Sequence, residues 1–172
     1  MVDLDFDVVE LPDADHPDVG DTAPAFTRPL VNDEFWEDRS LDSLLDDGPV
    51  LLVFTTMNGA FPATYTWNEL RERDWEREYD VSVVGVTISD PYDTTETIRD
   101  RGIDYPIFSD PQNGVAEAYG VVHDLDGMTG VTEPRPSVFL LDEDRTVEYA
   151  WTASEWPDFP PYDDIEGALD DR

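Results

Sequence analysis

A cluster of hydroxyl side chains marks the stretch of this sequence that is best suited to chemistry. It follows the apolar run 50–54 and consists of Thr55, Thr56, Thr64, Tyr65 and Thr66. A hydroxyl becomes a nucleophile only beside a base, and no base is spaced along the chain to activate these groups. Two interpretations stay open: the hydroxyls line a small polar pocket, or some cap the following helix and the rest pack. The first interpretation predicts a pocket lined by Thr56, Pro62, Thr64 and Pro136.

Arg135 is the second candidate for a functional role. In one interpretation its guanidinium faces an anion at the crevice beside the hydroxyl cluster. In the other it forms an ordinary ion pair, since the chain carries 42 carboxylates against 10 basic residues. Pro136 follows directly and precedes an apolar run, so its peptide bond is a candidate for either the cis or the trans form.

The chain has no cysteine, which excludes disulfides, thiolate metal ligands and thiol redox chemistry. The sequence also lacks a Ser-His-Asp arrangement, a phosphate-binding loop and a zinc motif. We therefore expect no metal site and no cofactor.

The elements that must position these residues follow from hydrophobic periodicity. The apolar run 50–54 predicts a buried strand, and the Gly/Pro break after it opens a long amphipathic helix from Pro62 or Ala63 to Tyr79. A strand over 81–88 and a helix over 94–101, capped by Thr94 or Thr95, come next. The sequence then predicts a short strand over 106–109, a helix over 115–119, a hairpin over 136–151 and a final helix over 163–169.

This order of elements predicts an α/β fold with a mixed central sheet and helices on both faces. We expect one domain over residues 1–172, long enough to bury a core. Residues 1–19 form an N-terminal strand or arm, in which residues 1–10 alternate apolar and acidic side chains. Residues 153–172 form a C-terminal extension.

The net charge of −32 is the most unusual property of the composition, and all ten basic residues are arginine. Self-repulsion of this size destabilises a compact chain unless concentrated salt screens it. We therefore expect a cytoplasmic protein of a halophile that accumulates salt. The charge repels phosphate, so no nucleic-acid partner is expected, and no segment has the length or pattern of a membrane span or a signal peptide.

Three stretches of the sequence resemble the peroxiredoxin group of the thioredoxin-like fold, the family named for alkyl hydroperoxide reductase C and thiol-specific antioxidant. The first is Gly20 to Phe26, with its Ala-Pro and Phe. The second runs from Tyr105 through the Asp110 turn to Val121, and the third is 135–142, which begins with Arg135. Together they extend the resemblance over roughly residues 17 to 152 and imply a thioredoxin-like fold of the peroxiredoxin type.

In that family a peroxidatic cysteine lies in the first turn of the helix after the central strand, with the Arg nearby. A gapless count from the strand places Ala63 at that position, whereas a count back from Glu69 and Leu70 places Thr66 there. Neither residue can form a sulfenic acid, so the family's peroxide reduction is excluded for this sequence. Whether the protein is an enzyme of any kind stays open.

Three hypotheses about function follow. The first is a redoxin of the antioxidant lineage that lacks the catalytic thiol and pairs with an active redoxin partner or with itself as a homodimer. The second is a non-catalytic binding module that uses the vacated helix N-terminus and Arg135 for a small anionic ligand or a protein partner. The third, an enzyme working through Thr or Tyr hydroxyls and carboxylates, ranks last because no base is spaced to activate them.

Overall fold

The computed structural model describes residues 7–123 and 128–172. Its centre is a seven-stranded sheet in the order β10-β9-β4-β5-β6-β2-β3. The central strands β4 (Val50–Phe54), β5 (Ser82–Thr87) and β6 (Ile107–Ser109) are parallel. The outer strands β2 (Thr27–Val31), β3 (Trp36–Ser40), β9 (Ser137–Leu141) and β10 (Val147–Thr152) add antiparallel pairs at both sides. The expected mixed central sheet is confirmed.

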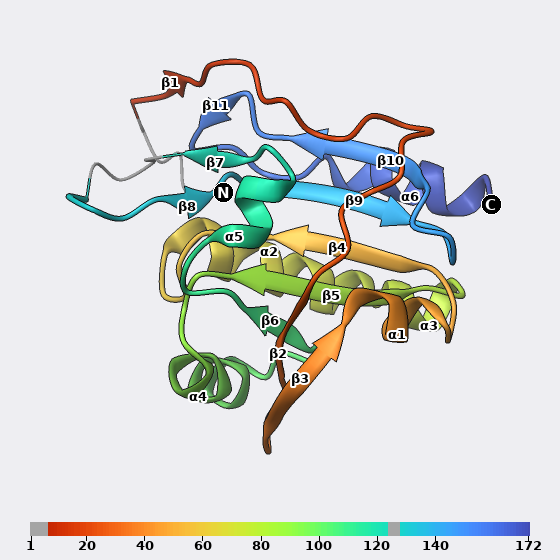
Figure 1. Cartoon of the computed structure of the whole chain (residues 1–172), viewed down its shortest axis with the longest axis horizontal. Helices are drawn as coiled ribbons and strands as arrows, with labels where there is room; N and C mark the ends of the chain where they lie inside the picture. The colour runs from red at the N-terminus through yellow and green to blue at the C-terminus, as the bar shows by residue number, and fades with distance from the viewer. Residues whose placement is uncertain (1–6, 124–127) are drawn as a thin grey trace.

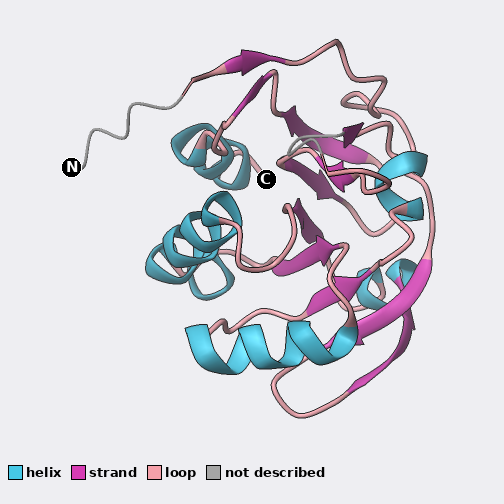
Figure 2. Cartoon of the chain, turned by 90° about the vertical axis from the view of Figure 1, so that its left-hand side faces the viewer, coloured by secondary structure: helices cyan, strands magenta, loops and turns pink. Residues whose placement is uncertain are grey.

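Helices cover both faces of this sheet, as the edge-on view in Figure 2 shows. One face packs against α1 (Leu41–Leu45) and α5 (Gly114–Ala118) around Phe54 and Phe139. The other face packs against α2 (Phe61–Arg73), α3 (Trp75–Glu78), α4 (Pro91–Arg101) and α6 (Tyr162–Asp170). Successive residues of a strand point to opposite faces, so β4 contributes Leu52 to the first cluster and Leu51 and Val53 to the second.

The long helix expected up to Tyr79 is divided in two, which corrects the prediction. α2 ends at Arg73, Asp74 takes the left-handed conformation with φ of 49°, and α3 begins at Trp75. Asp tolerates this conformation better than most residues. The turn allows the Trp75 side chain to be buried, where its indole N–H donates to Glu166 at 2.8 Å.

The cap of α4 also differs from the prediction. The helix begins at Pro91, three residues before Thr94, and the Asp90 side chain accepts a hydrogen bond from the Asp93 N–H. Proline is favoured in a first helical turn because its missing N–H would have no partner there. The Asp-Pro pair therefore starts a helix, whereas β5 already ends at Thr87.

The described part of the N-terminal arm, residues 7–19, runs beside β11 (Glu155–Trp156) and β10 along the upper edge of the molecule in Figure 1. Only β1 (Val9–Glu10) is a strand, paired with β11; residues 1–6 of the strand predicted over 1–10 lie outside the described residues. The pairing stays short because Pro157, which follows β11, has no N–H to donate. The His16 ring lies 6.0 Å from the Phe139 ring, which places the arm over the face opposite α2.

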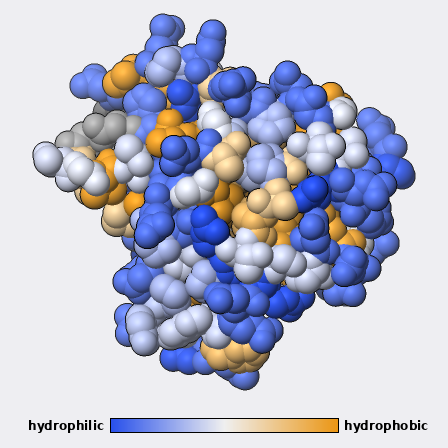
Figure 3. Space-filling model, viewed as in Figure 1, coloured by the Kyte–Doolittle hydropathy of each residue, from blue (hydrophilic) through white to orange (hydrophobic). Residues whose placement is uncertain are grey.

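A small two-stranded sheet formed by β7 (Val122–His123) and β8 (Glu133–Pro134) precedes β9. The surface seen in Figure 3 is mostly hydrophilic, with apolar residues in small separate groups. In the part of the chain that the structure describes, no helix has the length and apolar character needed to cross a membrane.

Candidate functional site

The segment between β4 and α2 is held in place by hydrogen bonds that its backbone and the Asn58 side chain donate. The Met57 N–H donates to Oε1 of Glu133 at 3.0 Å, and the Asn58 N–H donates to Oγ of Ser89 at 2.9 Å. The Asn58 side chain donates to Oγ1 of Thr94 at 3.0 Å. These contacts tie the loop to β8, to the end of β5 and to α4, so the N-terminus of α2 has a defined position at the carboxyl ends of the parallel strands.

The first turn of α2 is built without a polar side chain at its cap. Ala60 is the N-cap residue and has no side-chain hydrogen bond to offer, and Pro62 follows in the first turn. The helix N-terminus therefore keeps its partial positive charge and its N–H groups, which is the usual setting for an anion or a thiolate. Ala63 is the third helical residue and is buried, while Thr66 is the sixth and lies in the second turn.

The hydroxyl cluster does not converge on one point. Thr64 and Thr66 donate back to carbonyls of their own helix, to Ala60 at 3.3 Å and to Pro62 at 2.8 Å. None of the hydroxyls caps α2, so the capping interpretation is wrong for this helix. The Tyr65 side chain is 49% exposed, and Thr55 and Thr56 are buried with no hydrogen-bond partner for Oγ1 among the described residues. A Thr or Tyr enzyme gains no support from this arrangement.

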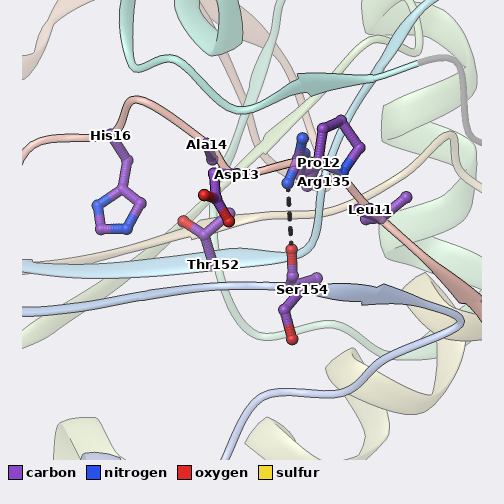
Figure 4. Close-up of a pocket in the computed structure, with 9 residues that line it drawn as sticks. Leu11, Pro12, Asp13, Ala14, His16, Arg135, Thr152 and Ser154 are labelled. Carbon is purple, nitrogen blue, oxygen red and sulfur yellow. Dashed lines mark hydrogen bonds between the residues drawn. The ribbon is translucent and has the colours of Figure 1, made fainter.

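Arg135 lies apart from the first turn of α2. Its guanidinium lines a cavity of about 400 Å³ between the arm and the end of β10, and no residue of α2 lines that cavity (Figure 4). Pro136 is buried beside it, and the cis X-Pro bond in the described chain is Trp156–Pro157, so the cis alternative for Pro136 is wrong. The predicted pocket residues Thr56, Pro62, Thr64 and Pro136 do not line the Arg135 cavity either.

The ion-pair interpretation of Arg135 finds no support in the described residues, where none of its nitrogens lies within 4.0 Å of a carboxylate. The side chain is only 4% exposed. Burial lowers the pKa of Arg135, and the negative charge of Asp13 opposes that effect. Its position was not foreseeable from the sequence, because nothing local indicates that residues 11–16 return to cover it.

Comparison with protein families matches residues 19–150 to the AhpC/TSA family. Two Mycobacterium tuberculosis proteins described as peroxiredoxins, from two strains, are each 33% identical to the chain over 136 residues, covering 74% of this chain and 80% of theirs. The crystal structure of peroxidoxin BcpB from Mycobacterium tuberculosis superposes with a TM-score of 0.73 at 28% identity, covering 90% of this chain and 96% of that one. A thiol peroxidase from Chromobacterium violaceum reaches the same TM-score of 0.73 at 22% identity, covering 92% and 89%, which shows a shared fold.

Proposed function

The chain belongs to the AhpC/TSA family, the peroxiredoxins, and from that premise we propose that it is a member without thiol peroxidase activity. One observation carries the proposal: the sequence has no cysteine, and the first turn of α2 holds Ala63 where the resemblance implies a peroxidatic sulfur. The thiolate is the group that attacks a peroxide and becomes a sulfenic acid in this chemistry, and only a cysteine side chain supplies it.

Ala63 is the better candidate for the position of the missing sulfur than Thr66. It lies in the first turn of α2, where the N–H groups and the positive end of the helix dipole lower the pKa of a thiol. Thr66 lies one turn further along, and its hydroxyl is bonded to the Pro62 carbonyl of the same helix. A sulfur at 66 would be further from the N–H groups and closer to helix carbonyls.

The test is turnover of hydrogen peroxide and an alkyl hydroperoxide in multimolar KCl with a dithiol reductant. We expect the chain to consume no peroxide above the protein-free rate. Ala63→Cys is expected to form a sulfenic acid, detectable by trapping and mass, and Thr66→Cys is the matched control that adds a thiol one turn away. Measurable turnover by the cysteine-free chain would contradict the proposal, and a reactive Thr66→Cys with inert Ala63→Cys would reverse the assignment.

We further propose that the chain associates with a second copy of itself through aromatic side chains beside α2. Phe61, Tyr65 and Phe159 are 37%, 49% and 37% exposed, and their ring centroids lie 6.0 to 6.5 Å apart. Grouped apolar side chains on a surface often mark an interaction site.

Sedimentation velocity in multimolar KCl tests this association. We expect a concentration-dependent dimer that the double variant Tyr65→Ser, Phe159→Ser converts to monomer. Val19→Ser, at an exposed residue of the arm, is the control and should leave the dimer intact. A monomeric parent chain, or a double variant that sediments like the parent, would refute the association.

We also propose that the protein works in the cytoplasm of a cell with concentrated potassium salts. The support is the net charge of −32 and the exclusive use of arginine among the basic residues.

A further inference from the structure

The arm pocket is the cavity between residues 11–16 of the arm and residues 152–154 at the end of β10, with Arg135 in its wall. It lies on the sheet face opposite α2, so it is separate from the position of the missing sulfur. Figure 4 shows the arm along one side of the pocket and Thr152 and Ser154 along the other. The family proposal above does not depend on this pocket.

Arg135 is a buried cation whose hydrogen-bonding capacity is largely unused. Nη1 donates to the Ala153 carbonyl at the long distance of 3.5 Å, and Nε has no partner within the described chain. A guanidinium has five N–H donors, and a buried N–H group without a hydrogen-bond partner raises the free energy of the folded state. In a chain with 42 acidic residues, an internal partner would have been easy to supply. The arrangement therefore fits an external anion.

Thr152 supplies a second buried hydrogen-bonding group in the wall of the pocket. Its Oγ1 is buried and without a hydrogen-bond partner in the part of the chain described. A hydroxyl can donate to a carboxylate oxygen, so Thr152 and Arg135 together provide two independent donors in the wall of one cavity. Leu11, Pro12 and Ala14 add apolar surface to the pocket, which His16, Ala153 and Ser154 also line.

The charge around the pocket restricts the anion that it accepts. Asp13 also lines the pocket, and its negative charge acts on the Arg135 guanidinium. A doubly charged phosphate would be repelled by Asp13, whereas a single carboxylate matches one planar guanidinium. The volume of about 400 Å³ lies near the lower end of small-molecule sites, roughly 300–1,000 Å³.

We propose that the arm pocket binds a small monocarboxylate with a short apolar body, held by the Arg135 guanidinium and the Thr152 hydroxyl. The carboxylate accepts hydrogen bonds from both groups, and the apolar body lies against Leu11, Pro12 and Ala14.

The test compares isobutyrate with isobutyramide, its neutral analogue of nearly the same shape, by ligand-observed NMR on the full chain at constant KCl. Isobutyrate is expected to bind and isobutyramide to bind at least about tenfold more weakly, because only the carboxylate pairs with the guanidinium. Equal binding of the two probes, or no binding of isobutyrate, would overturn the proposal.

Three variants locate the site. Arg135→Met keeps an unbranched stem but removes the guanidinium with its charge and its donors, and should weaken isobutyrate binding by about tenfold or more, while circular dichroism verifies the fold. Thr152→Val tests the second donor with less risk to folding and should also weaken binding. Asp13→Asn should tighten binding by about twofold, since screening limits the effect of one charge in concentrated salt. Unchanged affinity in Arg135→Met and Thr152→Val, or weaker binding by Asp13→Asn, would contradict the assignment.

Discussion

Lowering KCl from about 3 M to about 0.1 M is expected to unfold the chain, because the Debye length rises from less than about 3 Å to about 10 Å. The 42 carboxylates then repel one another across the surface. Five of the ten arginines form seven ion pairs within the described residues, too few to offset that repulsion. Far-UV circular dichroism should show helix and sheet signal gained in one cooperative transition as KCl rises. A sucrose series of matched osmolarity is the control and should not restore the signal. Equal folding at both salt concentrations would refute the halophilic origin.

Two single variants show whether the position of a charge or only the total charge sets the salt requirement. Asp171 is the C-cap of α6, where a carboxylate faces the negative end of the helix, whereas Asp163 lies in the first turn and pairs with Arg73 at 3.0 Å. Each of the two Asp→Asn changes removes one negative charge, so the two variants have the same net charge. Asp171→Asn is expected to lower the KCl midpoint of folding, and Asp163→Asn to lower it less or to raise it. Identical shifts would mean that net charge alone determines the midpoint.

Gly85→Ala is expected to destabilise the protein by about 2 kcal/mol or more, because the added methyl group has no space. Gly85 lies in the middle of β5, and a Cβ there would be 2.6 Å from Cη2 and Cζ2 of Trp67 and 3.1 Å from Cγ1 of Ile107. Trp67 is buried in α2, so the indole cannot move away without disturbing the packing of the helix on the sheet. In a chain of this size the loss corresponds to a Tm lower by about 4–8 °C, measured in multimolar KCl.

A double-mutant cycle separates this contact from a general cost of alanine in a strand. Trp67→Phe removes the ring atoms nearest to Gly85 and is destabilising alone, because it leaves a cavity. In the double variant the new methyl group occupies part of that cavity, so we expect a favourable coupling of about 1 kcal/mol or more. Gly167→Ala, in α6 with no atom near its Cβ position, is the control and should be neutral or stabilising. Additive effects would show that the Gly85–Trp67 contact is not the cause.

The sequence by itself determined those features that depend only on residues close together along the chain. Hydrophobic periodicity located β4, β5, β6, the hairpin of β9 and β10, and the helices α4, α5 and α6 to within three residues, since alternation and helical spacing are local properties. Ser40 was predictable as the cap of α1 for the same reason, and its side chain accepts from the Ser43 N–H. The absence of cysteine, which supports the proposed loss of thiol peroxidase activity, can be seen in the sequence with no structure at all, and that reaction requires a thiolate.

The tertiary structure alone decided on which face of the sheet each candidate residue lies. Arg135 precedes β9, and a shift of one residue along a strand moves a side chain to the opposite face, so its separation from α2 could not be derived from spacing. The arm pocket joins residues 11–16 to residues 152–154, and such distant contacts have no local signal. The left-handed Asp74, which divides the predicted helix, likewise depends on the space that the core offers to Trp75.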